Sequence, residues 1–141
     1  MDRVLQAERD LFTVSLTRMA TLDLAAVTVD CADPAALAAF YRAAAGAEIN
    51  HEDSDSVWVT LAGMTWIYRR VDGYCAPTWP DPQVPLHFHL EFFVEDLDRA
   101  VEELLGHGAA LMEPQPNPEG TGLLVLLDPA GRPFCIGVRV S

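Results

Sequence analysis

Hydrophobic and polar positions follow the same order twice along the chain. Residues 24–31 and residues 86–94 both alternate between apolar and polar side chains, which is typical of a strand with one buried face. Each strand leads to an aspartate suited to cap a helix, Asp33 or Asp96, and then to apolar residues at helical spacing that end near a glycine. The two aspartates lie 63 positions apart. Self-similarity of this kind indicates a duplicated unit.

Three shorter strand-like segments follow each predicted helix. They are residues 47–50, 56–61 and 64–70 in the first unit and residues 109–112, 121–127 and 133–140 in the second. The sequence therefore predicts an α+β fold of two tandem βαβββ modules, at about residues 22–71 and 86–141. Their curved sheets are expected to enclose a shared cavity. Residues 71–85 contain four prolines and Trp79, so we expect an irregular linker that could fold over a pocket.

The first 21 residues lie outside the duplication. Their apolar residues recur at loosely helical intervals with charges between them, which predicts an amphipathic N-terminal helix before a single domain at 22–141. No apolar run has the character of a signal peptide or the length of a membrane span, so we expect a cytoplasmic protein without a membrane partner.

The charge balance narrows the classes of partner. Nine arginines face 21 acidic residues, which gives a net charge of −12 and argues against nucleic acid as a partner. The same charge would modestly favour a cationic small molecule. The chain has no lysine, which excludes Schiff-base chemistry on that side chain. The three cysteines have no CxxC spacing, so neither a zinc knuckle nor a disulfide framework is predicted.

Candidate functional side chains lie on one face of the strand at residues 86–94. The opposite face of this strand is apolar and should pack under a helix; it consists of Phe88, Leu90, Phe92 and Val94. One face of the last strand should pack in the same way, with Phe134, Ile136 and Val138. The remaining face carries His87, His89, Glu91 and Phe93, with Cys135, Gly137 and Arg139 from the last strand. Further aromatic residues that could line a ligand pocket are Trp58, Trp66, Tyr68 and Trp79.

Several of these segments resemble those of a known superfamily. They are residues 29–34, 40–41 and 46 in the first unit and residues 89, 94–98 and 127–131 in the second. Over residues 22–140 the chain is similar to the vicinal oxygen chelate superfamily, which includes glyoxalases, bleomycin-resistance proteins and extradiol dioxygenases. Within it, the chain most resembles glyoxalase-like domains of actinobacterial type.

The resemblance implies where a metal would be held. Metal-dependent members take ligands from four strands, at positions that correspond to Ala26, Ile67, His89 and Cys135. Only His89 keeps the expected type of ligand, and a hard divalent ion held by one histidine and one cysteine would bind poorly. We therefore expect no metal cofactor of the superfamily type. The alternative is a divalent metal held by His87 and His89, with Glu91 adding a carboxylate.

Three functions remain open on this evidence. The favoured one is a cytoplasmic small-molecule-binding protein that sequesters an aromatic or cationic ligand, as bleomycin-resistance relatives do between subunits; the same analogy implies a homodimer. The second is a lyase, isomerase or dioxygenase. In that enzyme, His89 would act together with His87, or it would form an acid–base pair with Glu91. A further alternative is that Cys135 is the nucleophile and His89 lies beside it. The third is a domain for protein–protein contact, whose cavity would be filled by its own side chains.

Overall fold

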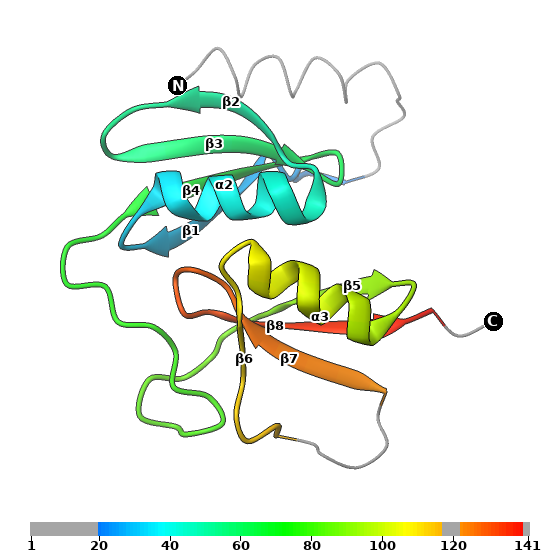
Figure 1. Cartoon of the computed structure of the whole chain (residues 1–141). Helices are drawn as coiled ribbons and strands as arrows, with labels where there is room; N and C mark the ends of the chain where they lie inside the picture. Colours follow the sequence, from blue (N-terminus) through cyan, green and yellow to red (C-terminus); the bar gives the residue numbers. More distant parts are fainter. Residues whose placement is uncertain (1–19, 117–121, 140–141) are drawn as a thin grey trace.

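The computed structural model describes residues 20–116 and 122–139, which form two four-stranded sheets and two helices (Figure 1). The first module consists of β1 (Ala26–Cys31), α2 (Pro34–Ala45), β2 (Glu48–Glu52), β3 (Ser56–Leu61) and β4 (Met64–Arg70). The second consists of β5 (Leu90–Val94), α3 (Leu97–Gly106), β6 (Ala110–Leu111), β7 (Leu123–Leu127) and β8 (Pro133–Val138). The predicted N-terminal helix lies outside the described residues.

The two sheets repeat one topology. Sheet A has the strand order β1-β4-β3-β2, and sheet B has the order β5-β8-β7-β6. The first and last strands of each module pair in parallel, and the other neighbours pair antiparallel. This arrangement confirms the two predicted tandem βαβββ modules. Within the described residues the sheets stay separate and close no barrel.

Both helices begin at the aspartates that the sequence indicates. The Asp33 carboxylate accepts a hydrogen bond from the Ala36 amide at 3.1 Å, and the Asp96 carboxylate accepts one from the Arg99 amide at 3.1 Å. Each bond satisfies an amide that the first helical turn leaves unpaired. Helix α2 ends at Gly46, whose φ of 72° is the left-handed conformation that glycine adopts most readily.

One hydrophobic core joins the two modules. Both helices lie between the sheets, on the sides that face each other (Figure 1). The Phe40 ring of α2 lies 6.0 Å from the Phe134 ring of sheet B, and the Tyr41 ring stacks on Tyr68 of sheet A at 5.9 Å. The Tyr41 hydroxyl also donates to the buried Asp128 carboxylate at 2.8 Å. The modules therefore share a core and a buried polar contact.

The start of the fifth strand differs from the prediction. It begins at Leu90 instead of residue 86, because the parallel register pairs Leu90 with Phe134 and would place Phe88 beside Arg132, in the turn before β8. Phe88 is 42% exposed, and the Arg132 guanidinium lies 5.7 Å from the centre of its ring. It shares a small pocket with Leu37 and Tyr41 of α2, so its expected packing under a helix is only partial. Val138, at the end of β8, is likewise 46% exposed.

The linker between the modules is irregular, as its prolines predict, and is fixed against the second module. The Tyr74 hydroxyl donates to the Ala130 carbonyl at 3.0 Å, and Thr78 and Val84 bond each other through their backbones at 2.8 Å. At Gly131 an added Cβ would lie 2.8 Å from the Ala76 side chain, so only glycine allows this approach. Among the described residues, no helix is long and apolar enough to cross a membrane.

Candidate functional site

The face on which the sequence predicts functional residues lies on sheet B. We call it the open face: the side turned away from α3, with Glu91 and Phe93 of β5 and Cys135 and Gly137 of β8. The parallel register places Glu91 beside Cys135 and Phe93 beside Gly137. Leu90, Phe92, Phe134 and Ile136 point the other way, into the core. The period-two alternation of the sequence therefore assigned the faces of residues 90–94 in β5 and 134–137 in β8 correctly.

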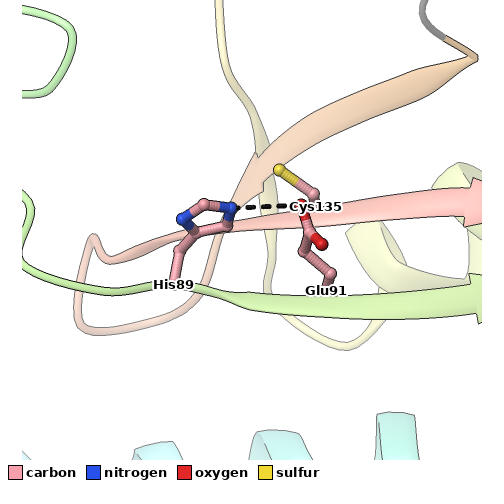
Figure 2. A group of neighbouring side chains, drawn as sticks. All are labelled: His89, Glu91 and Cys135. Carbon is pink, nitrogen blue, oxygen red and sulfur yellow. Dashed lines mark hydrogen bonds and ion pairs between the residues drawn. The ribbon is translucent and has the colours of Figure 1, made fainter.

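Three ionisable side chains meet on the open face. His89, just before β5, lies with its Nε2 atom 3.3 Å from Oε1 of Glu91. One donor atom from each of His89, Glu91 and Cys135 lies within 4.8 Å of the others. Figure 2 shows all three side chains projecting to the same side of the sheet, away from α2. Histidine, carboxylate and thiol can exchange protons or together ligate a cation.

The linker covers one side of this cluster. The Trp79 indole stacks on the His89 imidazole with ring centroids 6.5 Å apart and an interplanar angle of 12°. Trp79 also packs against the small hydrophobic cluster of Met112, Val125 and Cys135. The linker thus lies beside the imidazole and packs against the cluster that contains the cysteine. Met112 and Val125 gave no functional signal in the sequence, since both look like ordinary core residues.

The thiol of Cys135 is not activated by its surroundings. Burial raises the pKa of Cys135, and the nearby negative charge of Glu91 raises that pKa further. Both effects disfavour the thiolate, which is the nucleophilic form. A nucleophilic role for this cysteine would therefore require a ligand or cation that lowers its pKa.

An exposed aromatic–arginine pair lies farther along the open face. The Arg139 guanidinium lies 4.3 Å from the centre of the Phe93 ring, and Phe93 is 63% exposed. Gly137 of β8 pairs with Leu123 of β7, and a Cβ added to Gly137 would lie 2.7 Å from Cδ2 of Leu123. The missing side chain at Gly137 therefore lets Leu123 lie over the sheet. Phe93 can accept a planar cation on its face.

The remaining predicted site residues lie elsewhere. Tyr68 is buried and faces α2, and Trp66 donates its indole N–H to the Leu61 carbonyl at 3.2 Å on the same side of sheet A. Trp58 is buried in sheet A beside His51, with ring centroids 6.1 Å apart. His87 is exposed before β5. Of the aromatic residues proposed as pocket lining, the structure brings only Trp79 and Phe93 to the open face of sheet B.

The donor set does not fit the hard-metal centre that the resemblance implies. In sheet A the corresponding strand positions carry Ala26 and Ile67, which have no donor atoms. In sheet B, Cys135 offers a soft sulfur where a carboxylate would be needed. Hard cations require several oxygen ligands, and the cluster contains a single carboxylate, that of Glu91.

A cavity with a volume of about 520 Å³ lies on the other face of sheet B, between the modules. All five residues of β5 line it, so it runs along the outer edge of that strand. Its remaining walls are mainly apolar and include Phe40, Ala44, Trp66 and Leu104. Neither His89 nor Cys135 lines it. The sequence predicts a shared cavity, and three of its predicted site residues line this one: Trp66, Glu91 and Phe93. The other walls have the pattern of ordinary core residues, so the sequence did not indicate them.

Comparisons with known proteins agree with the fold. A family described as "Glyoxalase-like domain" matches residues 26–137. No curated protein matches the chain in a sequence comparison. Among solved structures, a glyoxalase/bleomycin resistance protein/dioxygenase family enzyme from Burkholderia phytofirmans is 21% identical, with a TM-score of 0.63; the match covers 84% of this chain and 100% of that one.

A second similar structure is the fosfomycin resistance protein FosX from Listeria monocytogenes. It is 17% identical, with a TM-score of 0.61 and coverage of 87% of this chain and 96% of that one. A mutant of it, 18% identical with a TM-score of 0.62 over 86% and 93% of the two chains, was solved with Mn(II) and 1S,2S-dihydroxypropylphosphonic acid. The family match identifies the chain as a member of the glyoxalase-like domain family. At these identities the solved structures support its fold alone.

Proposed function

We propose that this protein binds a small organic ligand on the open face of sheet B and sequesters it without the superfamily's metal centre. The observation that carries this proposal is the combination of aromatic and ionisable groups on one face: Phe93 is 63% exposed, and Trp79 lies beside His89, which contacts Glu91. Such a face offers apolar area together with a few polar groups that orient a ligand.

The favoured ligand class is a small aromatic cation. Glu91 is 61% exposed by its side chain and supplies a negative charge, and the Phe93 ring already holds the planar cation of Arg139. Cation–π contacts of this kind contribute about 0.5–1 kcal/mol at exposed sites and more when water is excluded. The net charge of −12 favours the approach of a cation and disfavours nucleic acid.

We further propose that the working form is a cytoplasmic homodimer. Within the described residues, β1 and β2 in sheet A and β5 and β6 in sheet B each pair with one strand only, so both edges of each sheet are unpaired. Leu22 and Leu24, just before β1, are 87% and 66% exposed. A second copy that covers these edges would shield both the unpaired backbone groups and the exposed leucines. Size-exclusion chromatography with light scattering measures the molar mass of the protein in solution and so tests this state directly. A monomer at micromolar concentration would contradict the proposed dimer.

A thermal-shift series tests the ligand site. We expect tryptamine, an aromatic amine, to raise the melting temperature more than indole, which lacks the charge, since a ligand that prefers the native state stabilises it. Phe93→Ala should reduce the shift. Phe88→Ala is the matched control, because Phe88 is also an exposed phenylalanine under an arginine but lies outside the open face. Equal shifts in both variants would refute the assignment.

The contact between His89 and Glu91 supports a second candidate, an enzyme that uses acid–base catalysis. At 3.3 Å from the carboxylate, the imidazole could take a proton from a bound substrate and return it elsewhere, as in an isomerase or lyase. A deuterium-exchange assay on candidate substrates separates the two functions. Exchange that disappears in His89→Ala but persists in His51→Ala would favour the enzyme over the sequestering protein.

A further inference from the structure

We propose that His89, Glu91 and Cys135 form a binding site for a thiophilic divalent cation of the zinc class. The mismatch with a hard-metal centre carries this inference, because the donors that replace the expected ones are themselves suited to a softer ion. Histidine nitrogen, thiolate sulfur and carboxylate oxygen are all established zinc ligands. The inference does not rest on the proposed organic ligand.

The distances in the cluster are close to those that zinc requires. Zinc–ligand bonds of about 2.0 to 2.3 Å at tetrahedral angles place neighbouring donor atoms about 3.3 to 3.6 Å apart. The His89 Nε2 and Glu91 Oε1 atoms are already 3.3 Å apart. The donor atoms all lie within 4.8 Å of one another, so the cysteine sulfur has to approach by no more than roughly 1.4 Å. Rotation of the exposed Glu91 and His89 side chains can supply this movement.

The surroundings of the cluster favour a bound ion. The Trp79 indole lies nearly parallel to the imidazole with ring centroids 6.5 Å apart, so the linker borders the cluster on one side. Met112 and Val125 bury the cysteine among apolar groups, so its bond to a cation would be weakly screened. His89 and Glu91 face solvent, from which water can complete the coordination (Figure 2).

Charge balance supports a divalent ion. A thiolate from Cys135 and a carboxylate from Glu91 together carry two negative charges, which a divalent cation neutralises, while His89 ligates as the neutral imidazole. Manganese and magnesium should bind far more weakly, because only one of the three donors is an oxygen. The soft sulfur ligand therefore makes the site prefer zinc to manganese and magnesium.

Calorimetric titration of the chelator-treated full chain with Zn²⁺ tests the proposal. We expect one ion per chain, and weaker binding in Cys135→Ser and in His89→Ala by more than roughly 100-fold, since changes outside the ligand shell alone cost about 10- to 100-fold. Titration with Co²⁺ should produce a thiolate-to-cobalt charge-transfer band that Cys135→Ser abolishes. Titration with Mn²⁺ should give much less heat.

Two variants serve as controls. Cys75→Ser removes an exposed thiol that is not part of the cluster. His51→Ala removes an exposed histidine that bonds the Asp53 carboxylate at 2.8 Å but has no cysteine beside it. Both should bind zinc as the parent protein does. Circular dichroism of the zinc-free variants checks that each is folded; if Cys135→Ser unfolds, His89→Ala decides alone, since His89 is exposed. Unchanged zinc affinity in a folded His89→Ala variant, or binding lost in Cys75→Ser, would overturn the proposal.

Discussion

Replacing Tyr41 by phenylalanine should destabilise the protein by breaking the buried contact between its modules. The Tyr41 hydroxyl donates to the Asp128 carboxylate at 2.8 Å, and the two residues are 4% and 5% exposed. Oδ1 of Asp128 accepts hydrogen bonds from the backbone amides of Ala130 and Arg132 at 2.8 and 3.2 Å. The Tyr41 hydroxyl is the donor to the other carboxylate oxygen, Oδ2. Hydrogen bonds to charged groups contribute about 1.5–3 kcal/mol, and we expect a loss of that size at neutral pH.

A second tyrosine provides the control for this substitution. Tyr68 stacks on Tyr41 at 5.9 Å and is equally buried, but its hydroxyl has no hydrogen-bond partner among the described residues. Tyr68→Phe should therefore be neutral or slightly stabilising, because it removes an unsatisfied polar atom. Urea unfolding followed by circular dichroism gives both free energies. Equal losses in the two variants would show that the hydroxyl contact between the modules contributes nothing.

The pH dependence of this effect has a defined sign. Burial raises the pKa of Asp128 above its ordinary value of 3.8, and the hydrogen bond from Tyr41 opposes that rise. The folded state therefore binds this proton more tightly than the unfolded chain, so the contribution of Asp128 to stability falls as pH rises through its folded pKa. The cost of Tyr41→Phe should shrink on acidification, because a protonated Asp128 leaves only a neutral hydrogen bond of about 1 kcal/mol to lose. A cost that grows toward low pH would refute the reasoning.

Three further predictions concern the open face. In the folded protein Cys75, which is exposed, should react with a thiol reagent much faster than Cys135, whose pKa is raised by burial; mass spectrometry of timed samples measures both rates. Trp79→Ala should speed the labelling of Cys135 selectively by uncovering its sulfur, whereas an unchanged rate would contradict the shielding. Gly137→Ala should move the Leu123 side chain, whose Cδ2 atom the new methyl would meet at 2.7 Å, and shift its methyl NMR signals with little loss of stability, because that side chain is 42% exposed and can rotate. Gly106→Ala, with no atom within 4 Å of the new methyl, should leave those signals unchanged.

The repeated pattern of the sequence predicted the modules because each local signal agreed with the fold. Asp33, Asp96 and Gly46 lie at the helix ends that they indicate, and the alternation in β5 placed Glu91 and Cys135 on one face. These features depend on neighbours along the chain or on a simple period, so a single sequence contains them.

Features that depend on tertiary packing were not predictable in the same way. Residues 86–88 alternate like a strand, yet the turn before β8 leaves them no partner to pair with. The stacking of Trp79 on His89 and the contact between Tyr41 and Asp128 join residues from different elements, and no spacing in the sequence encodes them. The cavity between the modules is similarly formed by residues that any core would contain.

The measurement that most directly tests the central claim is amide chemical-shift mapping of the labelled protein during titration with tryptamine. If the open face of sheet B is the ligand site, the largest shifts will fall on Leu123, Cys135 and Gly137, which lie on that face. Shifts concentrated instead on Ala44 and Leu104, in the apolar cavity between the modules, would contradict the account and move the site to the opposite side of the sheet.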